Sequence, residues 1–235
     1  GADNPDVATK LPDGTTYVPS VAAGTGHWSK TPAAFANPLL PGWGGVQPFV
    51  LGSGGEITLA APPTFGSALW DYYRDEVHTV ALEVAANASL QAIALFWADG
   101  AGTFTPPGHW NQIAVDLGAA EGLSECRMAR MLALLNTAQA DAFIACWWNK
   151  YHFDVPRPVT EIRANIDPLW SPLIATPPFP AYPSGHSSPS GAASQVLAYL
   201  FPAHAAELAA MASEAKNSRL YGGIHYTFDN DAGLD

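Results

Sequence analysis

The sequence predicts a mainly α-helical protein with an irregular N-terminal arm. From Ser67 onward, apolar residues recur every three or four positions, the spacing of one face of an α-helix. Residues 1–66 lack this periodicity and are rich in glycine and proline. No hairpin signal, repeating strand pattern or internal repeat is found. We therefore expect an irregular arm over residues 1–66 and a helical domain over residues 67–235, which together form one structural domain.

Caps and helix breakers divide the second part of the chain into separate helices. Ser124 and Thr137 are suitable N-cap residues, and Gly222-Gly223 is suited to end the last long helix. Pro106-Pro107 is expected to form a turn before a short helix. The expected helical ranges are 67–87, 89–97, 110–117, 124–135, 137–150, 158–165, 184–201 and 203–221.

The two cysteines lie on either side of a further expected turn. Cys126 and Cys146 lie ten residues on either side of Asn136, where we expect a turn between two antiparallel helices. Such a hairpin would bring both thiols to the same level. The sequence allows either a disulfide or two inert buried thiols, and it provides neither a disulfide framework nor a cysteine zinc site.

Composition excludes several classes of partner. The chain has 235 residues, only 10 lysines and arginines, and a net charge of −11, so nucleic acids and anionic membrane surfaces are poor partners. Glu83 and Asp141 interrupt the most apolar stretches, so a soluble protein is expected. The first residues have no basic-then-apolar pattern of a secretory signal. The compartment stays open, with a secreted or periplasmic location slightly favoured.

A proline-rich stretch has the properties of an oxyanion-binding turn. Residues 179–186 read FPAYPSGH, and the prolines hold the chain extended until a helix begins near Ser184. At the N-terminus of that helix, the Ser184 hydroxyl, the Gly185 amide and the His186 imidazole could surround an anion. The same residues are also ordinary at a loop-to-helix boundary, so the positions of the cations decide between the two interpretations.

Cations occur in two further motifs. Lys150 ends an expected helix, and Arg157 lies between two prolines. Arg219 and His225 are six residues apart, which places them on different sides of a continuous helix. A bend at Gly222-Gly223 would let them share one site. Each cation also has an ordinary explanation, such as complementing a helix dipole.

Together the three motifs resemble a known signature. Lys150-x6-Arg157-Pro158, Pro183-Ser184-Gly185-His186 and Ser218-Arg219-x5-His225-x3-Asp229 are similar, in order and spacing, to the signature of vanadium-dependent haloperoxidases and the type 2 phosphatidic acid phosphatase superfamily. The resemblance implies a helical bundle of the acid phosphatase/vanadium haloperoxidase type. It covers residues 150–229 and says nothing about the arm.

The resemblance also implies a role for each residue. His225 would be the axial vanadium ligand, or the nucleophile in a phosphatase, and Asp229 would orient it. His186 would be the general acid and base. Lys150 would also take part in catalysis. The expected vanadate-binding residues are Lys150, Arg157, Ser184, Gly185, Arg219 and His225.

Three aromatic or acidic positions favour a haloperoxidase. Trp147 and Phe179 resemble halide-pocket positions, Phe179 being typical of chloride-oxidising relatives, although both could simply be core aromatics. Asp99, in a segment similar to one in haloperoxidases, would steady Arg157 or Arg219. The implied partners are vanadate, hydrogen peroxide, halide and a small organic acceptor, and a homo-oligomer is compatible with the sequence.

The sequence leaves three functions other than a haloperoxidase to be weighed. The first is a soluble acid phosphatase that works through a phosphohistidine intermediate, with phosphate in place of vanadate. A zinc hydrolase using His186, His225 and Asp229 is disfavoured, because the neighbouring cations would repel a dication. A helical binding module with an inactive site is the third, although every signature residue is present. Residues 229–233 do not have the spacing of a calcium loop.

Overall fold

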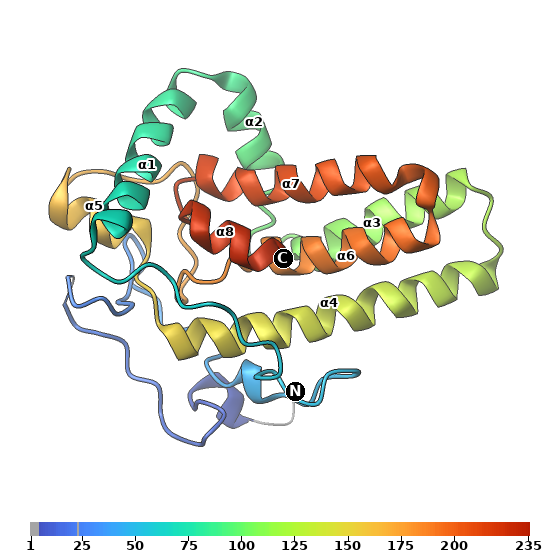
Figure 1. Ribbon diagram of the computed structural model, residues 1–235, viewed down its shortest axis with the longest axis horizontal. Helices are drawn as coiled ribbons and strands as arrows, with labels where there is room; N and C mark the ends of the chain where they lie inside the picture. The colour runs from blue at the N-terminus through green and yellow to red at the C-terminus, as the bar shows by residue number, and fades with distance from the viewer. Residues whose placement is uncertain (1–4, 23) are drawn as a thin grey trace.

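The computed structural model describes residues 5–22 and 24–235, and the regular secondary structure of these residues is helical, with no β-strand (Figure 1). Before residue 68 only two short 3-10 helices occur, η1 (Pro5–Ala8) and η2 (Trp43–Gly45). The later elements are α1 (Ala68–Ala85), α2 (Ala88–Phe96), α3 (Thr105–Ala120), α4 (Glu125–Phe153), α5 (Pro158–Asn165), α6 (Ser187–Leu200), η3 (Pro202–His204), α7 (Ala205–Tyr221) and α8 (Thr227–Leu234). The predicted mainly α class is confirmed.

The predicted turn at Asn136 is wrong, because α4 runs through it as one helix of 29 residues. The Asn136 side chain donates a hydrogen bond of 2.8 Å to the Leu132 carbonyl and one of 2.7 Å to the Asn111 side chain. An asparagine often ends a helix by bonding to its own backbone in another conformation. Here α3 and the helix itself satisfy the amide, so the helix continues.

The continuous α4 separates the two cysteines. Twenty residues along one helix span roughly 30 Å, far beyond the reach of a disulfide. Both thiols are free, with Cys126 exposed and Cys146 buried. The predicted hairpin that would bring the thiols to one level is therefore wrong, and only Cys146 is a buried thiol.

Two predicted helix starts also move. Pro106 and Pro107 lie in the first turn of α3, where a missing N–H group leaves no hydrogen bond unmade. They begin a helix longer than the predicted range 110–117. In contrast, α6 starts at Ser187, three residues later than predicted, and leaves Ser184 and Gly185 in the preceding turn. The predicted ranges of α1, α2, α5 and α7 are confirmed to within three residues.

Helices α4, α6 and α7 lie side by side, with α8 against α6 and α7 (Figure 1). One core cluster includes Trp110, Leu135 and Leu197 from α3, α4 and α6. A second joins α1, α5 and α8 through residues such as Trp70 and Ile162. Among the described residues no single helix is long and apolar enough to cross a membrane, although the bent pair α1 and α2 meets that test by length and composition.

Asp154 anchors the N-terminal arm to the end of α4. It adopts a left-handed conformation (φ 53°), and its N–H group donates to the Lys150 carbonyl at 2.9 Å. Its carboxylate accepts a 2.5 Å hydrogen bond from the Tyr17 hydroxyl and lies 3.1 Å from Nδ1 of His27. Its carbonyl accepts from the Trp28 N–H group at 2.8 Å. The arm is therefore joined to the segment directly after Lys150.

Replacing Asp154 with alanine is expected to lower the free energy of unfolding by about 2–4 kcal/mol. The change removes two hydrogen-bond acceptors and places a residue with a Cβ and no polar side chain in the left-handed region. Asp154→Asn is the matched control, because asparagine tolerates this conformation and can still accept from Tyr17. Urea unfolding measures both variants, and equal losses would argue against the anchor.

Candidate active site

Three cations are buried at the point where α4, α5 and α7 meet loops. Lys150 is in the last turns of α4, Arg157 directly precedes α5, and Arg219 is in the last turn of α7. Each is no more than 1% exposed. None of the three forms an ion pair with a carboxylate in the part of the chain that the structure describes. Backbone carbonyl groups take the place of carboxylates.

Lys150 points toward the predicted oxyanion turn. Its Nζ donates hydrogen bonds of 2.9 Å to the carbonyl groups of Pro180 and Ala181, and a further one to the carbonyl of Pro183. The ammonium also lies 5.0 Å from the centre of the Phe179 ring. Burial lowers the pKa of Lys150 to about 7. Near neutral pH the Lys150 side chain is therefore present in both its charged and its neutral form.

Arg157 is the second cation, and its guanidinium lies beside His225. Its Nε donates to the Phe179 carbonyl at 2.7 Å, and Nη1 donates to the Ile224 carbonyl at 2.8 Å. The same Nη1 lies 3.0 Å from Nε2 of His225. Nη2 is buried and has no hydrogen-bond partner among the described residues. A buried guanidinium with a free donor is suited to bind an anion.

The contacts of His225 define its tautomer. Nδ1 lies 2.9 Å from Oδ2 of Asp229, which also accepts a 3.0 Å hydrogen bond from the Tyr226 N–H group. We assign the ring proton to Nδ1, because a carboxylate only accepts. The lone pair of Nε2 therefore faces Arg157. Burial, followed by the charge of Arg157, lowers the pKa of His225 well below its usual value, so the ring is neutral.

Arg219 is held by α2 and by its own helix. Its Nη2 donates to the carbonyl groups of Trp97 at 2.6 Å and Ala94 at 3.3 Å. Its Nε donates to the Ser218 hydroxyl at 2.9 Å. Burial lowers the pKa of Arg219 to about 9, which still leaves it charged at neutral pH.

Asp99, which was expected to steady Arg157 or Arg219, forms no hydrogen bond with either arginine among the described residues. Its Oδ2 lies 3.0 Å from Nδ1 of His109, whose ring stacks on Trp97. His109 is in α3, and no motif of the sequence points to it. The Asp99 carboxylate still acts at a distance, because its negative charge favours the protonated form of Arg219.

The turn before α6 places Ser184, Gly185 and His186 beside the cations. The Ser184 N–H group donates to the Asp229 carbonyl at 2.8 Å, which joins this turn to α8. A Cβ at Gly185 would lie 3.6 Å from Cε of Lys150, so the glycine lies directly against that side chain. Nε2 of His186 is buried without a partner. Burial, followed by the charge of Arg219, lowers the pKa of His186 well below its usual value.

Trp147 and Phe179 form an aromatic wall at the site. Their ring centres are 4.9 Å apart, and the Trp147 Nε1 donates to the Leu39 carbonyl at 3.2 Å. The Phe179 ring centre also lies 4.8 Å from Cζ of Arg157. Phe179 therefore contacts the cations through its face, a favourable arrangement for a buried positive charge.

The site fits a tetrahedral oxyanion. Buried cations without carboxylate partners are costly, and an anion that accepts their hydrogen bonds would offset that cost. Arg157 Nη2 and His186 Nε2 are buried polar atoms that lack a partner in the described chain. No group of three or more His, Cys, Asp and Glu residues among the described residues could hold a metal ion directly.

The chain has clear similarity to known proteins. A family model described as the VCPO second helical-bundle domain matches residues 130–168. A vanadium chloroperoxidase from Curvularia inaequalis is 36% identical over 132 residues, which cover 45% of this chain and 22% of that protein. The residues that the family model matches include most of α4 and all of α5.

Solved structures give the same result. A bacterial vanadium-dependent iodoperoxidase is 32% identical, with a TM-score of 0.83, over 92% of this chain and 59% of that one. An apo-type bacterial vanadium-dependent chloroperoxidase, 18% identical over 93% of this chain and 62% of that one, shares the fold with a TM-score of 0.74. The chain thus spans less than two thirds of these relatives. In sequence and fold it is similar to the vanadium-dependent haloperoxidases.

Proposed function

We propose that this protein is a vanadate-dependent haloperoxidase, which oxidises halide with hydrogen peroxide. The balanced reaction converts halide, hydrogen peroxide and one proton to hypohalous acid and water. One observation carries the proposal: a neutral His225 presents its Nε2 lone pair beside Arg157, in a site where Lys150 and Arg219 are also buried. The names of the similar proteins support the same activity.

The cations and the turn before α6 would hold vanadate. Lys150, Arg157 and Arg219 would neutralise its charge, while the Ser184 hydroxyl and the Gly185 amide would add hydrogen bonds. When bound, vanadate supplies a Lewis-acidic centre that activates hydrogen peroxide toward halide. The fit rests on the unpartnered donor of Arg157.

His225 would bind vanadium through Nε2, and Asp229 would act through His225. By accepting the Nδ1 proton, Asp229 keeps the lone pair on Nε2 and fixes the direction of the ring. Burial raises the pKa of the Asp229 carboxyl to about 7, while the charges of Lys150 and Arg157 act in the opposite direction. Asp229 is therefore a positioning residue.

His186 would move the protons of the reaction. Its lowered pKa leaves the ring neutral at neutral pH, so that its unprotonated nitrogen can take a proton from hydrogen peroxide. It can then return that proton to the departing oxygen, which leaves as water. The negative charge of a bound anion would raise the pKa of His186 again and make the return easier.

A direct test compares halogenation with phosphate ester hydrolysis. Peroxide-dependent iodination, bromination and chlorination of a dimedone-type acceptor are measured with and without orthovanadate, in parallel with hydrolysis of p-nitrophenyl phosphate. Vanadate-dependent halogenation is expected. Hydrolysis that vanadate inhibits, without any halogenation, would contradict the proposal and support the soluble acid phosphatase instead.

Phe179 is expected to determine how well chloride is used. Its apolar ring lies beside Lys150 and weakens hydration around a bound halide, which matters most for the strongly hydrated chloride. Phe179→His should lower the ratio of chloride to bromide turnover by about tenfold. Phe179→Leu keeps the wall apolar and should leave the ratio within about twofold. Equal ratios in the wild type and both variants would contradict this role.

Lys150 is expected to make vanadate binding depend on pH. Its pKa is lowered to about 7, so the ammonium is present below that pH and lost above it. Above pH 7 the dissociation constant should rise by up to about tenfold per pH unit, because binding requires the proton. Lys150→Arg stays charged and reports any change due to vanadate itself. Parallel titrations at several pH values test this, and identical slopes would contradict it.

A further inference from the structure

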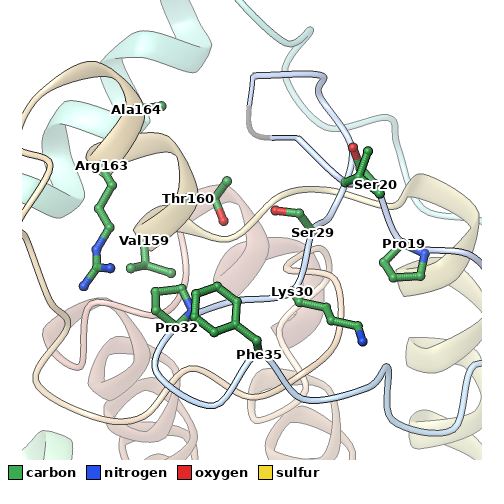
Figure 2. Close-up of a pocket in the computed structure, with 11 residues that line it drawn as sticks. Pro19, Ser20, Ser29, Lys30, Pro32, Phe35, Val159, Thr160, Arg163 and Ala164 are labelled. Atoms are coloured by element: carbon green, nitrogen blue, oxygen red, sulfur yellow. The ribbon is translucent and has the colours of Figure 1, made fainter.

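A cleft lies between the arm and α5 (Figure 2). Its volume is about 600 Å³, which is within the range of small-molecule sites. None of its lining residues belongs to the candidate active site. The lining residues include Ser29, Lys30, Phe35, Val159, Thr160 and Arg163.

Two hydroxyl groups of the cleft have no protein partner. Thr160 is only 9% exposed, and its hydroxyl makes no hydrogen bond to any described residue. The Ser29 hydroxyl, from the arm, likewise makes none within the described chain. Figure 2 shows the two oxygen atoms pointing toward each other across the cleft. Both residues line the cleft, and neither hydroxyl has a hydrogen-bond partner among the described residues, so both are available to a ligand.

Two cations flank the same cleft. Figure 2 shows Arg163 and Lys30 on either side of Pro32 and Phe35, and the Lys30 Nζ donates to the Asn37 side chain at 2.7 Å. Arg163 donates through Nε to the Trp170 carbonyl at 2.7 Å and through Nη2 to the Ser171 hydroxyl at 3.0 Å, which leaves Nη1 uncommitted within the described residues. Neither cation pairs with a described carboxylate. Two of 10 basic residues in a chain of net charge −11 therefore favour an anion here.

The remaining walls are apolar. Val159 is 1% exposed, and the Phe35 side chain lies beside it across the cleft. Phe35 is 58% exposed and has a φ of 47°, in the left-handed region that disfavours large side chains. Strain of this kind occurs mostly at functional positions. This backbone conformation places the Phe35 ring at the cleft.

We propose that this cleft binds a small aromatic carboxylate. Thr160 and Arg163 are three residues apart on α5 and so lie on one face, where both can bind the carboxylate. Ser29 adds a hydroxyl from the arm. The aromatic ring packs against the exposed face of Phe35, so the cleft can contact both the charged and the apolar part of such a ligand.

The test measures binding of 2-naphthoate and of the uncharged 2-naphthalenemethanol by titration calorimetry. Wild-type protein should bind 2-naphthoate with a dissociation constant below about 1 mM. Arg163→Gln should weaken 2-naphthoate about tenfold and the alcohol less than about twofold. Arg130→Gln, an exposed change of equal charge on α4, should alter neither.

Three further measurements guard against a folding artefact and against binding elsewhere. Thr160→Val keeps the side-chain shape and should weaken 2-naphthoate about threefold to tenfold. Phe35→Gly suits the local backbone and should weaken both ligands strongly. Saturating orthovanadate should leave 2-naphthoate binding unchanged. Displacement by orthovanadate, or equal binding of 2-naphthoate by the wild type and Arg163→Gln, would overturn the proposal.

Discussion

A His225→Ala variant is expected to lose vanadate-dependent halide oxidation by at least about a thousandfold. The change removes Nε2, whose lone pair faces Nη1 of the buried Arg157 guanidinium at 3.0 Å. Removal of a single preorganised donor costs about 100-fold to 1000-fold in other enzymes, and a direct ligand contributes at least as much. The turnover number, measured at saturating orthovanadate, tests this expectation.

An Asp229→Asn variant tests whether Asp229 acts by positioning the His225 ring. An asparagine amide group can donate to Nδ1 and so favour the tautomer whose Nε2 carries a proton. That tautomer has no lone pair to offer, so activity should fall by about 10-fold to 100-fold, the usual effect of a residue behind a metal ligand. Unchanged activity in His225→Ala, with folding confirmed by circular dichroism, would remove His225 from the site.

Local backbone chemistry explains why the bend between Arg219 and His225 could be predicted from sequence. The expected bend at Gly222-Gly223 is present, because α7 ends at Tyr221 and Gly223 adopts a φ of 74°. This bend lets Arg219 and His225 approach one site although they are on different faces of a continuous helix. A glycine in the left-handed region requires no partner elsewhere, so sequence alone suffices.

Contacts between distant segments could not be predicted in the same way. Whether Asn136 ends a helix depends on Asn111, which lies 25 residues away in α3. The pairing of Asp99 with His109 likewise depends on how α3 packs on Trp97. Asp154 accepts hydrogen bonds from the arm, 137 residues away in the case of Tyr17. In each case the partner of a polar group is set by tertiary packing, which local propensity does not encode.

Orthovanadate is expected to stabilise the wild-type protein against heat by roughly 5–10 °C. At one hundred times its dissociation constant, a ligand that binds only the folded state adds about 2.7 kcal/mol of stability. For a chain of this length, each kcal/mol raises the melting temperature by about 2–4 °C. The physical source is Arg157, Lys150 and Arg219, which are buried without ion-pair partners among the described residues.

Arg157→Lys is expected to abolish this thermal shift. Lysine keeps the positive charge but lacks the planar guanidinium, including the unpartnered Nη2 donor. A loss of about 100-fold in vanadate affinity would bring the same orthovanadate concentration down to the dissociation constant, where only about 0.4 kcal/mol of stabilisation remains. Arg130→Gln lies outside the site on α4 and should keep the full shift. Because the readout is a melting temperature, a full shift in Arg157→Lys would contradict anion binding by the guanidinium whatever reaction the site catalyses.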